Sequence, residues 1–345
     1  MERFRIKAPD LAMDLGSAMT RAVRVDQNVM IEEPSVVALD FQKLQILDVG
    51  YEAKDLLGKS PENMIAVRPL QNGVISDYDL TQALIEHYIH RLLPGISMVA
   101  PRLVIAYPSG ATDVEQRALE DACLQSGVRD VFLVEESMAA AYGAGVIQNA
   151  TQGAFILNIG AGTTEVAMVN SYGVIASQTV KRGGDALDRA IREFVRDKYD
   201  LMIGENTAEK MKCQIGTLRA DRQQDAMEVS GRDLLTGMPK SIDLYAEDVT
   251  EAILPFVREV VENLRLTLEK TPPELSADVM KRGVLLTGAG ARIDGLDAFI
   301  QEELHIEASL SKHPAQDTIL GCRYLMLHLN EMLGRGERDD SVQKD

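Results

Sequence analysis

Residues 154–170 read AFILNIGAGTTEVAMVN, and the fold is decided in this stretch. An apolar run ends near Asn158, a tip with Gly160 and Gly162 follows, and a second apolar run resumes soon afterwards. Run length and residue type predict two buried strands joined as a hairpin. Glycine lets backbone N–H groups come close to a ligand, and the Thr163 hydroxyl adds a further donor. The tip is therefore suited to hold phosphate, although most glycine-tipped hairpins are only turns.

A second stretch of the same design lies near the amino terminus, where residues 11–25 read LAMDLGSAMTRAVRV. Asp14 takes the position of Asn158, and Gly16 and Ser17 begin the tip. The two units start about 144 residues apart, which predicts a duplicated core. With one tip from each half facing the other, a nucleotide could lie between them.

Glu136 lies at a predicted junction between a strand and a helix. Residues 131–134 form a short apolar run, and the small residues 138–141 predict a helix. An acid at this place either orients a water molecule beside a ligand or only stabilises the helix dipole. The local sequence leaves both interpretations open.

Three later features could extend a ligand site. The glycine pair 183–184 precedes a helix with an apolar stripe, and Glu209 and Lys212 share one face of the next predicted helix. The two charged residues form either a surface pair or a contact to a nucleoside. Residues 284–287 predict a strand that runs into a glycine turn at 288–291, and this turn could form the floor of an adenosine site.

The composition is that of an ordinary folded chain. At 345 residues, with 46% hydrophobic and 26% charged residues, the length allows about two domains. The net charge of −17 opposes a nucleic-acid surface, because binding to that polymer needs clustered Lys and Arg. Cys123, Cys213 and Cys322 are widely spaced, which predicts buried free thiols, a reducing compartment and no zinc site. Neither a secretory signal nor a membrane-spanning run is expected, which favours the cytoplasm.

One predicted loop is apolar. Residues 94–101 read PGISMVAP, and the prolines and glycine predict a loop. Ile96, Met98 and Val99 either pack into the adjacent core or dip into a membrane or a partner protein. Residues 334–345 are polar and charged and are predicted to form a disordered tail.

Two phosphate hairpins, Glu136 before a small helix and a late glycine turn, in this order, resemble the actin-like ATPase superfamily. Within it, the bacterial MreB family fits best. The segments that look most like this family are EPSVVAL at 33–39, VGYEAK at 49–54, and the stretches 65–77, 204–212 and 268–275. The resemblance runs from about residue 10 to residue 330.

This resemblance implies an α/β fold of the actin-like ATPase type, with a duplicated ribonuclease-H-like core and two domains around a nucleotide cleft. Each domain would be split into two subdomains. The expected ranges are 1–147 for domain I, with a small subdomain at about 32–70, and 148–333 for domain II, with a small subdomain at about 185–250.

The resemblance also implies a bacterial actin homologue that binds ATP or ADP with Mg²⁺ and has at most a slow ATPase activity coupled to polymerisation. The expected partners are further copies of the chain in antiparallel double filaments, the inner face of the cytoplasmic membrane, and proteins of cell-wall elongation and shape. Such filaments guide peptidoglycan synthesis in rod-shaped cells. The loop with Ile96, Met98 and Val99 matches in place the family's membrane-insertion loop.

Carried over residue by residue, the resemblance assigns roles around the nucleotide. Glu136 and Thr163 would position the attacking water, and Asp14 would hold Mg²⁺ largely through water. Glu209 and Lys212 would contact the nucleoside. The other residues expected at the nucleotide are Gly16, Ser17, Ala18, Met19, Asn158, Gly160, Ala161, Gly162, Gly183, Gly184, Gly288, Ala289, Gly290 and Ala291.

Several of these positions depart from the family's pattern. Asn158 stands where the family usually has Asp, which removes a negative charge beside the cation. Met19 replaces an Asn, and Ser137 replaces a proline. Ala161 and Ala289 replace glycines that we expect to need positive φ, at about 1 kcal/mol each. Together these changes motivate the hypothesis of a divergent paralogue that keeps nucleotide binding but hydrolyses ATP slowly or not at all.

Two alternatives to a filament protein remain. A small-molecule kinase of the same superfamily shares the phosphate hairpins, but it would need an acidic base above an acceptor pocket, and no motif identifies one. A regulatory paralogue that does not polymerise fits the departures at the nucleotide site equally well.

Overall fold

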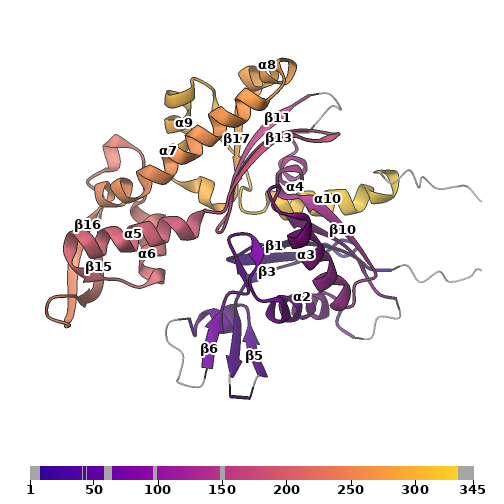
Figure 1. Cartoon of the computed structure of the whole chain (residues 1–345), viewed down its shortest axis with the longest axis horizontal. Helices are drawn as coiled ribbons and strands as arrows, with labels where there is room; N and C mark the ends of the chain where they lie inside the picture. The colour runs from indigo at the N-terminus through magenta and orange to yellow at the C-terminus, as the bar shows by residue number, and fades with distance from the viewer. Residues whose placement is uncertain are drawn as a thin grey trace, which may run out of the picture.

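The computed structural model describes residues 8–40, 42–43, 45–57, 64–95, 99–147 and 152–332. Two five-stranded sheets dominate it, one formed by each half of the chain. In Figure 1 the first half, indigo to magenta, lies below the second half, pink to orange.

The first sheet has the strand order β10-β9-β1-β2-β3. Neighbours among β1, β2 and β3 are antiparallel, whereas β9 runs parallel to β1 and to β10. Its strands are β1 (Asp10–Leu15), β2 (Met19–Arg24), β3 (Val29–Pro34), β9 (Arg102–Tyr107) and β10 (Asp130–Glu135).

The second sheet repeats this plan with the order β13-β12-β11-β17-β18. Three antiparallel strands again precede two parallel ones, so β11 is equivalent to β1 and β12 to β2. The predicted duplication of the core is confirmed. The strands are β11 (Ala154–Ile159), β12 (Thr164–Asn170), β13 (Gly173–Val180), β17 (Val284–Thr287) and β18 (Ala308–Leu310).

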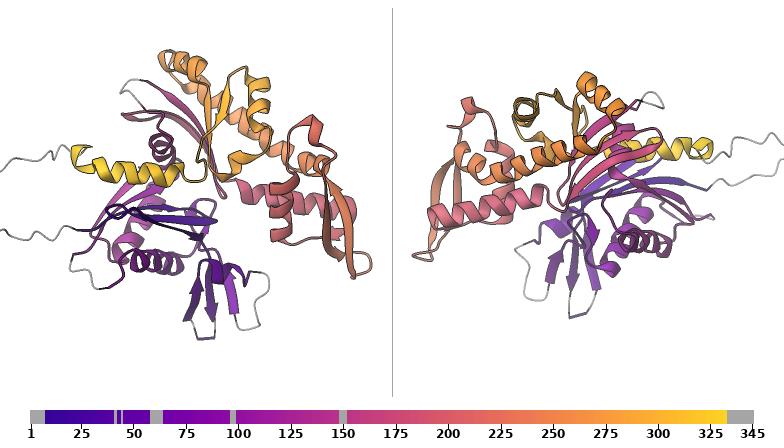
Figure 2. Two further views of the ribbon diagram at one scale, coloured as in Figure 1. Left: turned by 180° about the vertical axis from the view of Figure 1, so that it is seen from behind. Right: turned by 45° about the horizontal axis from the view of Figure 1, so that its top comes forward.

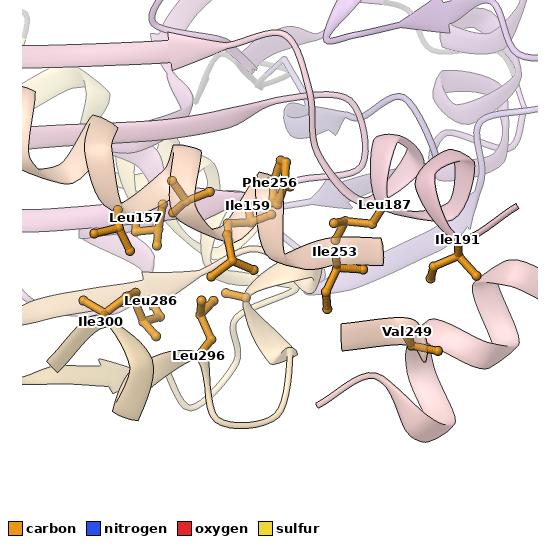
Figure 3. Packing of buried hydrophobic residues seen from close by; sticks show 14 of the residues in the cluster. Leu157, Ile159, Leu187, Ile191, Val249, Ile253, Phe256, Leu286, Leu296 and Ile300 are labelled. Carbon is orange, nitrogen blue, oxygen red and sulfur yellow. The ribbon is translucent and has the colours of Figure 1, made fainter. Parts of the chain in front are cut away.

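Strand β11 is apolar along its length because both of its faces are buried. Leu157 and Ile159 point to one face and pack with Ile253 and Phe256 of α7 (Ala246–Lys270), as Figure 3 shows. On the other face, Ile156 packs with residues of α4 (Glu136–Gly143). Because successive side chains of a strand point to opposite faces, β11 contributes to two separate hydrophobic cores.

Helix α10 (Asp317–Met332) returns from the second half to the first sheet. Its Ile319, Cys322 and Leu325 share a core with Ala12 and Val104. In the left view of Figure 2 this yellow helix lies along the indigo and purple sheet. The expected range of domain II included residues 317–332, and the packing leads us to propose that they belong with domain I.

Each half also contains a three-stranded sheet, and these lie at outer ends of the molecule in Figure 1. They occur at 37–67 and 201–245, where small subdomains are expected, and their exact boundaries stay predictions. The strands and helices of these parts are β4 (Val37–Asp40), β5 (Gln45–Val49), α1 (Tyr51–Lys54), β6 (Met64–Val67), α5 (Gly184–Tyr199), β14 (Leu201–Met202), α6 (Glu205–Ile215), η1 (Ala220–Arg222), β15 (Ala226–Asp233) and β16 (Pro239–Tyr245).

The remaining elements cover the sheets or connect their strands. Among them, α3 begins with a capping box in which the Thr112 hydroxyl accepts from the Glu115 N–H and the Glu115 carboxylate accepts from the Thr112 N–H. These elements are β7 (Leu70–Gln71), β8 (Val74–Ile75), α2 (Tyr78–Leu92), α3 (Asp113–Gln125), α8 (Pro273–Arg282), η2 (Ala289–Arg292) and α9 (Leu296–Leu304).

The structure contradicts one prediction about the cysteines, and residues of two predicted segments fall outside the described residues. Cys123 and Cys322 are buried as expected, but Cys213, on α6, is exposed. Ile96 and Met98 of the apolar loop, and the expected tail 334–345, lie outside the described residues. Within the described ranges, no helix combines the length and the apolar character needed to cross a membrane.

We predict that Leu264→Ala lowers the free energy of unfolding by about 2–5 kcal/mol, since Leu264 is fully buried on α7 and its loss leaves a cavity. Leu266, on the same helix, is 37% exposed, so Leu266→Ala should cost less than about 1 kcal/mol. Urea denaturation of both variants checks this. Equal losses would mean that the second core does not pack as described.

Candidate functional site

The tips of the two equivalent hairpins face each other across a cavity that opens to solvent. One wall comes from each half of the chain, and Glu136, at the start of α4, lines it as well. The predicted residues that line this cavity are Asp14, Gly16, Ser17, Ala18, Met19, Glu136, Asn158, Gly160, Ala161, Gly162, Thr163, Gly288 and Ala289.

The two tips approach so closely that only glycine fits at position 162. A Cβ on Gly162 would lie 2.6 Å from Ser17 Oγ and 2.8 Å from the Gly73 nitrogen. The Gly73 N–H in turn donates to Ser17 Oγ at 3.0 Å. The tip of the second half therefore rests on the first hairpin and on the β7–β8 turn.

Gly288 brings the end of β17 against the second hairpin. Its φ is +81°, and a Cβ there would lie 2.6 Å from Asn158 Oδ1. The expected positive φ at Ala161 and Ala289 is wrong, because neither residue adopts it. Ala289 begins the 3-10 helix η2, whose right-handed backbone suits alanine. Alanine at these two positions therefore causes no backbone strain from a positive φ.

A second cavity adjoins the first. Gly184, Gly290, Glu209 and Lys212 line it, so the predicted nucleoside residues lie beside the predicted phosphate residues. Both cavities share the residues Ala18, Met19, Gly160, Ala161 and Ala289.

Glu209 and Lys212 line this second cavity and have different partners. Lys212 Nζ donates to Asp188 Oδ2 at 2.8 Å and to the Gly184 carbonyl at 3.0 Å. Glu209 Oε2 lies 4.0 Å from Lys54 Nζ, which belongs to the first half. Burial raises the pKa of Asp188 to about 6, although Lys212 acts to lower it.

Two predicted residues lie behind the cavity walls. A Cβ on Gly183 would be 2.5 Å from the Gly160 carbonyl, and the Gly184 N–H donates to that carbonyl at 2.9 Å. Gly183 therefore supports the β11–β12 tip from behind. Ala291 is buried in the core of the second half.

Acidic side chains gather at the deep end of the first cavity. Burial raises the pKa of Asp14, and Arg21 opposes this effect. The pKa of Glu136 is raised well above its usual value by burial and by the nearby carboxyls of Glu165 and Asp14. Asn158 Nδ2 donates to Glu136 Oε2 at 3.3 Å. This end of the cavity therefore disfavours additional negative charge unless a cation is present.

Sequence reasoning missed Glu165, which does not line the cavity but lies near Glu136 in its wall. Its side chain is fully buried and accepts from the Ser109 N–H at 2.6 Å and from the Ser137 hydroxyl at 3.1 Å. Burial raises its pKa to about 7. The available signal was the hairpin register, in which Glu165 lies directly opposite Asn158. Arg21 was missed in the same way, and it lies opposite Asp14.

Comparison with known proteins identifies the family. A model of the family described as MreB/Mbl protein matches residues 8–333. The chain belongs to the MreB/Mbl family. The predicted resemblance is thereby confirmed over nearly the whole chain.

Curated members of the MreB/Mbl family align along most of their length. The chain is 36% identical over 331 residues to the cell shape-determining protein Mbl of Bacillus cereus, covering 96% of this chain and 99% of that protein. It is 38% identical over 320 residues to the cell shape-determining protein MreB of Escherichia coli, covering 91% and 92%.

A solved structure from the family confirms the fold class. The crystal structure of MreB5 of Spiroplasma citri bound to ADP has a TM-score of 0.89 and 30% identity, covering 96% of this chain and 99% of that one. The crystal structure of the same protein bound to AMPPNP has a TM-score of 0.90. The chain is therefore an actin homologue of the MreB/Mbl type.

We predict that the unfolding free energy of the wild type falls relative to that of Glu165→Gln as pH rises from about 4.5 to 7, by up to about 3 kcal/mol. In this window the unfolded chain loses the Glu165 proton while the folded chain keeps it, so stability decreases with pH. Urea denaturation at several pH values measures the effect, with Glu228→Gln on the exposed side of β15 as control. Parallel curves for wild type and Glu165→Gln would contradict it.

Proposed function

We propose that this chain binds ATP and ADP with Mg²⁺ between its two hairpin tips and polymerises into filaments on the inner face of the cytoplasmic membrane, where they guide cell-wall synthesis. One observation carries the nucleotide part: equivalent glycine tips from both halves line a single cavity. The related MreB5 structures bound to ADP and AMPPNP support it. The names of the curated relatives support a role in cell shape.

The donor atoms at the deep end of the cavity fit a magnesium ion. Asp14, Glu136 and Asn158 all line it and carry oxygen atoms, the ligand type that hard cations prefer. Asp14 is proposed to hold the ion largely through water. When bound, Mg²⁺ would offset the negative charge of the phosphates.

The other predicted residues divide between two proposed roles. Backbone N–H groups of the two tips, with the hydroxyls of Ser17 and Thr163, would hold phosphate oxygens, because both hydroxyl residues line the cavity. Glu209 and Lys212 would contact the nucleoside from the adjoining cavity. Glu136 and Thr163 would position the attacking water.

We further propose that hydrolysis is slow, because Asn158 holds Glu136 in a hydrogen bond that needs no cation. An aspartate at this position would place a second carboxylate about 3.3 Å from Glu136, and that arrangement would require a cation or a proton. Met19 and Ala161 add apolar surface to both cavities where the resemblance expects a polar side chain or a glycine. Nucleotide binding is compatible with these residues.

We predict that Asn158→Asp increases phosphate release from ATP at saturating Mg²⁺, by roughly tenfold, since it restores a carboxylate ligand beside Glu136. Asn170→Asp is the matched control, because Asn170 lies at the far end of the same hairpin. A phosphate-release assay compares the three proteins. If wild type and Asn158→Asp release phosphate at the same rate, slow hydrolysis through Asn158 is refuted.

Polymerisation and membrane binding need a separate test. With ATP and Mg²⁺ on a lipid monolayer, negative-stain electron microscopy should show paired filaments of the wild type. A variant with polar residues at Ile96, Met98 and Val99 should form filaments in solution but leave the lipid, since the membrane loop is proposed from the resemblance. Absence of filaments with ATP, ADP and AMPPNP would refute polymerisation and favour the regulatory alternative.

A further inference from the structure

A buried cation lies in the wall of the first cavity. Arg21 on β2 lies directly opposite Asp14 of β1 and directly opposite Glu32 of β3. Directly opposed residues of antiparallel strands point to the same face, so the three side chains form a row across the sheet. Arg21 Nη2 donates to Glu32 Oε1 at 2.8 Å, and Nη1 lies 3.6 Å from Asp14 Oδ2.

These contacts leave part of the hydrogen-bonding capacity of the Arg21 guanidinium unsatisfied. Its side chain is only 10% exposed, and its Nε has no hydrogen-bond partner among the described residues. A buried donor without a partner is costly, and guanidinium offers five N–H groups in one plane. The contact to Asp14 is also longer than a strong hydrogen bond. Because Arg21 also lines the cavity, an incompletely hydrogen-bonded guanidinium lies next to the space that a ligand would fill.

Glu32 fixes one end of this guanidinium. Its Oε1 accepts from Arg21 Nη2, and its Oε2 accepts from Gln316 Nε2 at 3.4 Å, just before α10. The carboxylate is thus held between β3 and the start of the C-terminal helix. An anchored guanidinium loses less entropy when it binds an anion than a free side chain would.

Positive charge in the wall of the first cavity comes from Arg21. Among the described residues that line it, Arg21 is the only Lys, Arg or His. Glu165 occupies the equivalent position of the second hairpin, opposite Asn158. The duplicated hairpins therefore place a basic residue opposite Asp14 and an acidic residue opposite Asn158.

We propose that Arg21 is a built-in counter-charge for the phosphates of the nucleotide, and that it makes nucleotide binding only weakly dependent on Mg²⁺. The inference rests on the proposed nucleotide function of this cavity. Guanidinium is permanently charged and matches phosphate oxygens with paired N–H donors. It also offsets the charge of Asp14, so the nucleotide meets less repulsion when no metal is bound. Arg21 thus performs part of the task usually left to the cation.

Titration calorimetry with ADP, in Mg²⁺ and in EDTA, tests the proposal on the full chain. The wild type should lose less than about tenfold in affinity on removal of Mg²⁺, whereas Arg21→Leu should lose at least tenfold more in EDTA, about 1.4 kcal/mol per tenfold. Arg21→Lys should retain part of the affinity. Arg24→Leu is the matched control, because Arg24 lies on the same strand and pairs with the exposed Asp26.

Two results would overturn the proposal: ADP binding by Arg21→Leu in EDTA that equals the wild type, or wild-type binding in Mg²⁺ that disappears in EDTA. A wild type that binds no ADP in either buffer would overturn the proposed nucleotide function as well, so the two failures are distinguishable. Circular dichroism checks folding. If Arg21→Leu does not fold, the double variant with Arg21→Leu and Glu32→Gln takes its place in the same comparison. The second substitution removes the carboxylate that the loss of Arg21 leaves unpaired.

Discussion

The site depends on the contact between the two hairpin tips, where Gly162 meets Ser17 and the Gly73 backbone with no room for another carbon atom. This contact brings the turns after β1 and β11 to one point, so each half supplies one wall of the cavity. Near the second cavity the halves meet through ion pairs, from Arg68 to Asp185 at 3.2 Å and to Glu205 at 2.9 Å. Partly exposed ion pairs are weaker restraints than close-packed backbone. The halves are therefore expected to separate at lower cost near the second cavity than at the hairpin tips.

The physical pattern of the chain made the two hairpins predictable. Strand β11 is buried on both faces, which requires an uninterrupted apolar run, and its turn needs glycine for the close approach at Gly162. Both signals are local in sequence. Glu165 and Arg21 were harder to assign, because burial and distant partners such as Ser109 and Glu32 give them their character. The strand register pairs them with Asn158 and Asp14, but local periodicity alone does not reveal that register.

Two predictions, the strain at Ala289 and the burial of Cys213, are wrong. Alanine in place of glycine suggested strain at Ala289, yet the backbone there enters a right-handed 3-10 turn that any residue adopts. Wide cysteine spacing predicts three buried thiols, but Cys213 is exposed and lines the second cavity. The resemblance implies that residues 317–332 belong to domain II, and the packing of apolar side chains such as Ile319 on the first sheet is the ground for our proposal that they belong with domain I. Contacts between residues far apart in the chain decide these features, and no local pattern encodes them.

The return of α10 also constrains the order of folding. The first sheet is complete in sequence once β10 ends at Glu135, but one of its faces is covered by Ile319, Cys322 and Leu325. During synthesis, that face stays without its cover until α10 has left the ribosome, about 180 residues after β10. Exposed apolar surface on a nascent chain favours aggregation, and pairing over such a sequence distance is slow. The amino-terminal half is therefore expected to need protection by chaperones until its last helix arrives.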